Sequence, residues 1–196
     1  MSRSPGSVAP FNSIDPLFGT NPIGFAFPTE NAPLVFDMAT SAMTWYGLVL
    51  AKSEGKEIAQ NMAIDSNGLP TTDPATAMSG ALLPFDRGYK SSGLGMMIEM
   101  LAGPLVGSSF CDNKTFDHDW GTLILAIDPE LLVNINIFKK KNTELIEIVR
   151  NSRTQNNEPV RIPGESSREA YARAFELGTV EIDEEIAREL GIQVGK

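Results

Sequence analysis

The sequence has few of the residue types on which several common kinds of site depend. Its 196 residues include one cysteine, Cys111, so a disulfide within the chain is impossible and a zinc site built on cysteines is not expected. It contains one histidine, His118, in a polar segment typical of a solvated loop. We therefore interpret Cys111 as a small buried hydrophobic residue. We interpret His118 as a surface or capping residue rather than a catalytic base.

Basic residues are scarce relative to acidic ones. The formal net charge is −9, from 16 Lys and Arg against 25 Asp and Glu. This balance argues against a nucleic-acid surface and against a polybasic membrane anchor. No apolar run is long enough to span a bilayer, and the first residues do not resemble a secretory signal. The sequence thus predicts a cytoplasmic protein that would bind an anion locally, through a few Lys or Arg side chains and backbone N–H groups.

The remaining composition is typical of a globular protein and not of a disordered one. Apolar residues make up 42% of the sequence and charged residues 21%. Residues 1–22 combine many Pro, Gly and Ser with large apolar side chains, which predicts an irregular but ordered lead-in segment. Strands are predicted at 23–27, 34–36, 122–127 and 180–182, and the first two are close enough to form a hairpin.

Helices are predicted where apolar residues recur at helical spacing, at 45–52, 75–78, 93–105, 143–152, 166–177 and after 183. The helix at 93–105 is apolar enough to be mostly buried, apart from Glu99. Residues 82–90 before it are predicted to be a loop. Residues 166–169 offer a capping box for the helix that ends at Gly178.

Three features suggest ligand contacts, and each has a structural alternative. Gly93-Leu94-Gly95 lacks the third glycine of a dinucleotide fingerprint, so close helix packing explains these glycines better. Asp37 follows a predicted strand and precedes a helix start, where it would either contact a ligand or simply cap the helix. Lys90 precedes the apolar helix, where it would meet a phosphate or carboxylate or remain a solvated loop residue. Residue chemistry alone leaves both alternatives open for Asp37 and Lys90.

Five motifs in a fixed order carry a family resemblance. They are Gly-Thr-Asn-Pro-Ile at 19–23, Phe-Asp-Met-Ala-Thr-Ser at 36–41, Thr-Thr-Asp-Pro at 71–74, Gly-Tyr-Lys-Ser-Ser-Gly-Leu at 88–94 and Arg-Ile-Pro-Gly-Glu at 161–165. Together they resemble the type-2 malate/L-lactate dehydrogenase family, which also includes ureidoglycolate, sulfolactate and diketogulonate enzymes and a cyclic-imine reductase. The resemblance covers nearly the whole chain.

The resemblance implies a non-Rossmann α/β (α+β) fold with a mixed or antiparallel sheet and flanking helices. It implies a homodimer and hydride transfer between NAD or NADP and a small 2-oxo or 2-hydroxy acid. Asp37 is implied as a catalytic-site residue that orients the cofactor or a histidine. The implied cofactor contacts are Pro33, Leu34, Val35, Phe36, Asp37, Met38 and Ala39, then Tyr89 and Lys90, then Gly164, Glu165 and Ser166. No metal is implied. Many relatives carry a histidine where this chain has Glu165.

The chain also departs from the family pattern. Relatives carry roughly another half-chain before the Gly-Thr-Asn-Pro motif, and that region holds a Ser-His-Gly histidine that resembles a general acid. His118 does not match it. We therefore interpret residues 1–196 as a single cofactor-binding portion of such a domain, truncated at its N-terminus. The alternative is a catalytically inactive truncated homologue that binds nucleotide or associates with a full-length partner.

Overall fold

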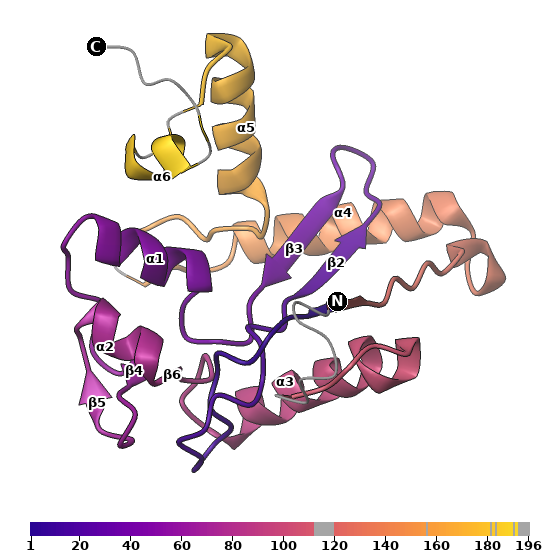
Figure 1. The fold of residues 1–196 in the computed structure, drawn as a ribbon. Helices are drawn as coiled ribbons and strands as arrows, with labels where there is room; N and C mark the ends of the chain where they lie inside the picture. Colours follow the sequence, from indigo (N-terminus) through magenta and orange to yellow (C-terminus); the bar gives the residue numbers. More distant parts are fainter. Residues whose placement is uncertain (112–119, 156, 181, 183, 190, 192–196) are drawn as a thin grey trace. The chain divides into compact units, whose positions relative to one another are not determined.

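A computed structural model describes residues 1–111, 120–155, 157–180, 182, 184–189 and 191 (Figure 1). Residue contacts divide the chain into two compact units. The first comprises Met1–Gly24 and Asp37–Ile127, and the second comprises Phe25–Phe36 and Asp128–Lys196. The polar segment that contains His118 lies outside the described residues. The prediction of a single cofactor-binding portion over residues 1–196 stays a prediction.

The elements form the expected mixture of helices and small sheets. The first unit holds β1 (Ser2–Arg3), α1 (Trp45–Ser53), β4 (Ala63–Ile64), β5 (Pro70–Thr71), α2 (Pro74–Ser79), β6 (Ala81–Leu82), α3 (Tyr89–Ala102), η1 (Pro104–Val106) and β7 (Gly121–Thr122). The second holds η2 (Pro129–Leu131), α4 (Ile135–Arg150), α5 (Glu165–Leu177) and α6 (Glu184–Glu189). The hairpin of β2 (Ile23–Phe27) and β3 (Leu34–Met38) crosses the division between the units. None of the described helices combines the length and the apolar composition needed to cross a bilayer.

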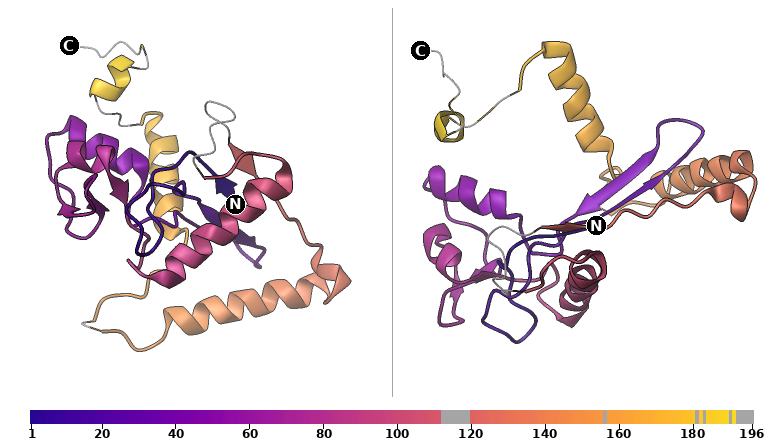
Figure 2. Two further views of the ribbon diagram at one scale, coloured as in Figure 1. Left: turned by 60° about the horizontal axis from the view of Figure 1, so that its bottom comes forward. Right: turned by 45° about the vertical axis from the view of Figure 1, so that its right-hand side comes forward.

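The core of the first unit gathers around a three-stranded sheet. β4 lies in its centre and pairs antiparallel with β5 and β6. Helices α1 and α2 pack against each other beside this sheet, as both views of Figure 2 show. The main apolar cluster includes Val8, Phe18, Leu48 and Leu82. Val8 and Phe18, which belong to residues 1–22, are 3% and 8% exposed. The ordered lead-in segment over residues 1–22 stays a prediction.

Several local predictions are confirmed by the contacts that hold the elements. The two strands predicted at 23–27 and 34–36 pair as a hairpin, and the second runs on to Met38. Thr44 caps α1 by accepting a hydrogen bond from the Gly47 N–H, and Asp73 caps α2 by accepting one from the Thr76 N–H. Thr44 and Asp73 therefore fix the starts of the two helices.

The strand predicted at 122–127 is wrong beyond its first residue. β7 covers only Gly121–Thr122, which pairs antiparallel with β1, and Leu123 exchanges backbone hydrogen bonds with Met1. Ile124, Leu125 and Ile127 are 83%, 71% and 73% exposed. An apolar β-branched run forms a strand only where another strand meets its backbone, and no described backbone pairs with residues 124–127. The composition of this run predicted a strand, but a strand forms only where the backbone pairs with a neighbouring strand.

The helix predicted at 93–105 is present but begins earlier and is less buried than expected. It starts at Tyr89, so Tyr89 and Lys90 lie on a helical turn rather than in the predicted loop. Met96, Met97 and Met100 are 44–49% exposed, whereas the acidic Glu99 is buried. The prediction of a mostly buried apolar helix is therefore wrong, because Ile98 is the one large apolar side chain on a buried face that otherwise carries small and polar residues.

Boundaries in the second unit also differ from the predictions. α4 begins at Ile135, eight residues before the predicted start, because Asn134 accepts hydrogen bonds from the Asn136 and Ile137 N–H groups. α5 begins at Glu165 after Gly164, so the capping box predicted at 166–169 is wrong and those residues lie inside the helix. The predicted strand at 180–182 is also wrong, since neither described residue there, 180 or 182, is in a strand. The helix after 183 is confirmed as α6.

Candidate functional site

Tyr89 and Lys90 lie on the exposed first turn of α3. Tyr89 is 69% exposed, and Lys90 is also exposed. The turn before the helix is fixed by Asp86, whose Oδ1 accepts hydrogen bonds from the Gly88 N–H at 2.7 Å and from the Ser91 hydroxyl. Hydrogen bonding from Ser91 and from backbone N–H groups lowers the pKa of Asp86, against a smaller opposing effect of burial. A carboxylate at neutral pH therefore holds the turn that presents both side chains.

The segment that follows Asp37, Met38 and Ala39 is tied to the chain just before Asp86. The Thr40 carbonyl accepts from the Phe85 N–H at 3.0 Å, and the Ala42 N–H donates to the Leu83 carbonyl at 2.7 Å. Ser41 and Pro84 form an isolated antiparallel bridge between these contacts. The structure thus joins the two sequence-predicted stretches of the first unit through the backbone. Asp37 itself is exposed, and Met38 and Ala39 are half-buried.

The two glycines of the motif in α3 have different surroundings. A Cβ built on the buried Gly95 would lie 3.4 Å from Thr40 Oγ1 and 3.7 Å from the Phe18 ring, which is ordinary contact, whereas one on Gly93 would meet nothing within 4 Å. Gly95 therefore lies on the packed face of the helix, but the space at neither position requires a glycine. The interpretation that close helix packing explains these glycines stays a prediction.

In the second unit, the third predicted stretch packs on the first. Gly164 has a φ of +83°, and a Cβ on it would lie 2.5 Å from the Val35 carbonyl oxygen. Only a residue without a side chain fits this approach at this backbone angle. Gly164 thus brings Glu165 and Ser166, at the start of α5, beside residues 33–36 of the hairpin.

A cavity of about 170 Å³ opens where these segments meet α4. It is lined by Thr29, Asn31, Ala32, Leu34, Thr143, Ile146, Glu147, Arg150, Ile162, Glu165 and Arg168. Two hydrogen bonds join α4 to the hairpin beside the cavity: Asn142 donates to the Pro28 carbonyl at 2.9 Å, and the Glu30 N–H donates to Thr143 Oγ1 at 3.1 Å. Whole small-molecule sites measure roughly 300–1,000 Å³, so this cavity suits a fragment such as a phosphate or a ribose.

The charges of the cavity are two guanidinium groups and two carboxylates. Arg150 pairs with Glu147 at 2.6 Å and also with Glu165. The second carboxylate oxygen of Glu165 accepts from the Ile162 N–H at 3.2 Å. Within the described part of the chain, Arg168 makes no ion pair with a carboxylate. A bound anion at this cavity would therefore pair with Arg168 more readily than with Arg150, which already pairs with two carboxylates.

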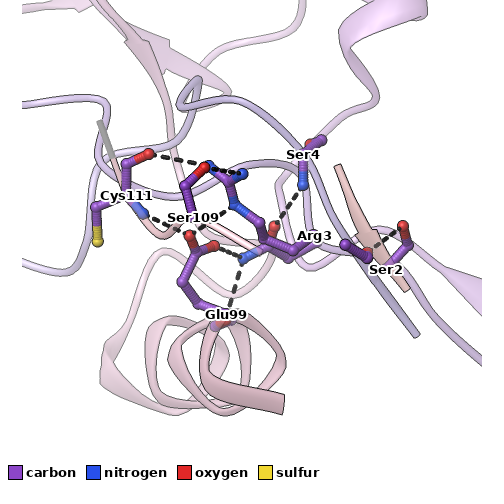
Figure 3. A network of polar contacts seen from close by, with 9 residues as sticks. Ser2, Arg3, Ser4, Glu99, Ser109 and Cys111 are labelled. Atoms are coloured by element: carbon purple, nitrogen blue, oxygen red, sulfur yellow. Dashed lines mark hydrogen bonds and ion pairs between the residues drawn. The ribbon is translucent and has the colours of Figure 1, made fainter. Parts of the chain in front are cut away.

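A buried polar network, drawn in Figure 3, was missed by sequence reasoning. Arg3 pairs with Glu99 at 3.1 Å, and both side chains are at most 4% exposed. The other Glu99 oxygen accepts from Asn21 Nδ2 at 2.7 Å, and the Cys111 N–H donates to Glu99 at 2.7 Å. The network ties the first residues of the chain to α3. The signal was visible as the one charge in the predicted apolar helix at 93–105, but its partner is 96 residues away.

In the part of the chain that the structure describes, neither the Cys111 thiol nor a metal site provides a further candidate for chemistry. Cys111 is half-buried, and burial raises the pKa of its thiol, with the Glu99 carboxylate raising it further and Arg3 lowering it. This shift suits a packing residue rather than a nucleophile. Among the described residues, no group of three His, Cys, Asp or Glu side chains could hold a metal ion.

Comparison with known proteins decides the family. The profile of the malate/L-lactate dehydrogenase family matches residues 1–191. The chain belongs to this family. It is 38% identical over 201 aligned positions to the L-sulfolactate dehydrogenase of Methanothermobacter thermautotrophicus, covering 96% of this chain and 57% of that protein. It is 41% identical to a Δ1-pyrroline-2-carboxylate/Δ1-piperideine-2-carboxylate reductase of Pseudomonas putida, over 71% of this chain and 43% of that protein.

Solved structures agree with the sequence comparison. The sulfolactate dehydrogenase of Methanocaldococcus jannaschii superimposes with a TM-score of 0.80 at 32% identity, over 98% of this chain and 58% of that one. The expected malate/lactate dehydrogenase-like fold is therefore confirmed. This member of the family spans just over half the length of the relatives that it matches along nearly its whole sequence.

Proposed function

We propose that this chain binds NAD or NADP and contributes to an oxidoreductase that acts on a small 2-oxo or 2-hydroxy acid or a related cyclic imine. The observation that carries the proposal is the position of Lys90 in a malate/L-lactate dehydrogenase family member. Lys90 is an exposed cation on the first turn of α3, a few residues from the backbone pairing that follows Asp37, Met38 and Ala39. Tyr89 beside it offers an aromatic face and a hydroxyl.

The local chemistry of both units suits an anionic cofactor despite the net charge of −9. In the first unit, Lys90 lies near the N–H groups at the start of a 14-residue helix, an arrangement that attracts anions. In the second unit, Arg168 and the first turn of α5 adjoin residues 33–36 across Gly164. We propose that Tyr89, Lys90 and the segment from Asp37 make one set of cofactor contacts. Residues 33–36 and 164–166 make the other.

The residues of this chain would bind and orient rather than transfer a proton to the substrate. A nicotinamide, when bound, supplies or accepts the hydride. Lys90 would neutralise a phosphate of the cofactor or the carboxylate of the acid. Asp37, exposed at the end of β3, would accept a hydrogen bond from the cofactor or from a proton-donating side chain. We further propose a homodimer in the cytoplasm, as the family resemblance implies.

The test of cofactor binding is a fluorescence titration of the purified chain with NADH and with NADPH. The decisive variant is Lys90→Ala, and the matched control is Lys52→Ala, an exposed helical lysine of the same unit. We expect saturable binding that Lys90→Ala weakens by about tenfold and Lys52→Ala leaves unchanged. An unchanged dissociation constant in Lys90→Ala, or no binding by the folded chain, would refute the proposal. The ratio of the two dissociation constants identifies the preferred cofactor.

A second candidate is a nucleotide-binding chain without turnover of its own. It is favoured by one observation, that the chain spans 57% of a dehydrogenase to which it is 38% identical. The two candidates separate in an assay of NADH and NADPH oxidation with the 2-oxo acids that correspond to malate and sulfolactate. Cofactor binding with turnover supports the oxidoreductase, and binding without turnover supports the second candidate.

A further inference from the structure

The turn from Asp86 to Ser91 is held by the carboxylate of its first residue. Asp86 Oδ1 accepts a hydrogen bond from the Gly88 N–H at 2.7 Å and one from the Ser91 hydroxyl. The Asp86 N–H donates back to Ser91 Oγ at 3.3 Å, so the contact is reciprocal. Ser91 is 1% exposed. This buried hydroxyl therefore anchors Asp86 to the packed face of α3.

The two residues enclosed by these contacts have no such anchors themselves. Within the described residues, the side chains of Tyr89 and Lys90 make no hydrogen bond or ion pair, and both are exposed. Their position therefore follows from the backbone on either side, at Gly88 and Ser91. Gly88, the residue that caps α3, provides no side-chain hydrogen bond. The Asp86 carboxylate supplies the cap in its place.

The neighbouring residue shows how constrained the turn is. Arg87 adopts a φ of +58°, a left-handed conformation that side chains other than glycine rarely take. Its guanidinium is fastened to the Asn61 carbonyl at 2.8 Å and to the Phe85 carbonyl at 2.6 Å. A residue keeps such an unfavourable backbone conformation only where the surrounding contacts stabilise it. Asp86 and Arg87 thus hold the turn from two sides.

We propose that Asp86 is a positioning residue for cofactor binding: it clamps the first turn of α3 so that Tyr89 and Lys90 face the cofactor in one fixed geometry. The inference rests on the proposed function, because it gives Lys90 a ligand. Nothing in the geometry requires Asp86 to touch that ligand. Its effect on binding passes through Lys90 and Tyr89, and this separates it from a direct contact.

The experiment is a double-mutant cycle between Asp86→Ala and Lys90→Ala, with dissociation constants for NADH and NADPH from fluorescence titration. We expect Asp86→Ala to weaken binding by about tenfold in the wild-type background and by less than about twofold when Lys90 is already alanine. Asp86→Asn keeps an acceptor oxygen for Gly88 and Ser91, so it should restore most of the affinity. A merely structural role would weaken binding equally in both backgrounds.

Asp73 provides the matched control. It also caps a helix of the first unit, accepting the Thr76 N–H at 2.7 Å and the Thr76 hydroxyl at 2.5 Å. Asp73→Ala should lower the melting temperature about as much as Asp86→Ala while leaving cofactor affinity unchanged. If Lys90→Ala alone has no effect, the proposed function fails. If Lys90→Ala weakens binding but Asp86→Ala does not, the positioning role is overturned. If Asp86→Ala does not fold, Ser91→Ala replaces it in the cycle, because it removes the hydroxyl that holds the Asp86 carboxylate.

Discussion

The contact between Gly164 and Val35 gives a prediction whose size can be worked from the geometry. A Cβ on Gly164 would lie 2.5 Å from the Val35 carbonyl oxygen, about 0.9 Å short of the 3.4 Å at which ordinary contact begins. Gly178, at the other end of α5, has a φ of +66° but open space around it. Comparing alanine substitutions at Gly164 and Gly178 therefore separates the free-energy cost of the backbone angle from the cost of the steric clash.

A non-glycine residue in the left-handed conformation costs about 1–2 kcal/mol, and the lost freedom of the unfolded chain returns about 0.4–1 kcal/mol. Gly178→Ala should therefore lower the free energy of unfolding by about 0–2 kcal/mol. Gly164→Ala carries the same balance plus an overpacking cost of about 1–3 kcal/mol, because the Val35 backbone must move. Its expected loss is about 1–5 kcal/mol.

Urea denaturation followed by far-ultraviolet circular dichroism measures both values. We expect Gly164→Ala to be the less stable variant by about 1–3 kcal/mol, the size of the clash alone. It should also weaken cofactor binding, because Glu165 and Ser166 shift with the start of α5. Equal losses for the two variants, or a larger loss for Gly178→Ala, would show that Gly164 does not pack on the hairpin as described.

Three further predictions follow from the first unit. Glu99→Ala should cost about 3–5 kcal/mol in urea denaturation, since it removes one partner of a buried ion pair, and a loss below 1 kcal/mol would contradict the network. Because burial raises its pKa, the Cys111 thiol should react with iodoacetamide at pH 8 more slowly than in the unfolded chain; equal rates would contradict this. Hydrogen bonds from Thr76 and Ser91 lower the pKa of Asp73 and Asp86, so their contribution to stability is present above the unfolded pKa of about 3.9 and is lost as the pH falls below it. Asp73→Asn and Asp86→Asn should flatten that acid dependence in melting experiments.

Local structure was predictable where the signal lies within a few residues. Thr44 and Asp73 fixed two helix starts because a short polar side chain accepts the N–H groups two or three residues ahead. The six residues between β2 and β3 predicted a hairpin because turn chemistry separates two apolar runs. Asn134 was overlooked as a cap, since the apolar periodicity of α4 becomes clear only after Thr143, and the predicted helix was shortened by eight residues.

Structure that depends on distant partners was not predictable in this way. The run from Leu123 to Ile127 has the composition of a strand, but a strand requires a neighbouring backbone, which sequence composition does not specify. The burial of Glu99 depends on Arg3 and Asn21, which are brought to it only by the fold. Similarly, the pairing of Thr40 with Phe85 and the approach of Gly164 to Val35 join motifs that the sequence presents far apart.

The candidate residues themselves came from the family resemblance. Residue chemistry left Asp37 and Lys90 with two interpretations each, and the fold places both outside the core in exposed positions. What the structure adds is the support beneath them: the Asp86 clamp, the strand-like pairing after Ala39, and the cavity beside Glu165. Mutation of the residues that make these contacts can test whether the motifs bind the cofactor.

Hydrogen–deuterium exchange of the chain with and without NADH or NADPH shows which segments bind the cofactor, because it reports each segment separately. We expect the cofactor to slow amide exchange in residues 33–39, 88–91 and 164–166, with little change in α1, α2 or the exposed part of α4. Protection confined to other segments, or no protection at saturating cofactor, would contradict the claim that these three stretches bind the nicotinamide dinucleotide.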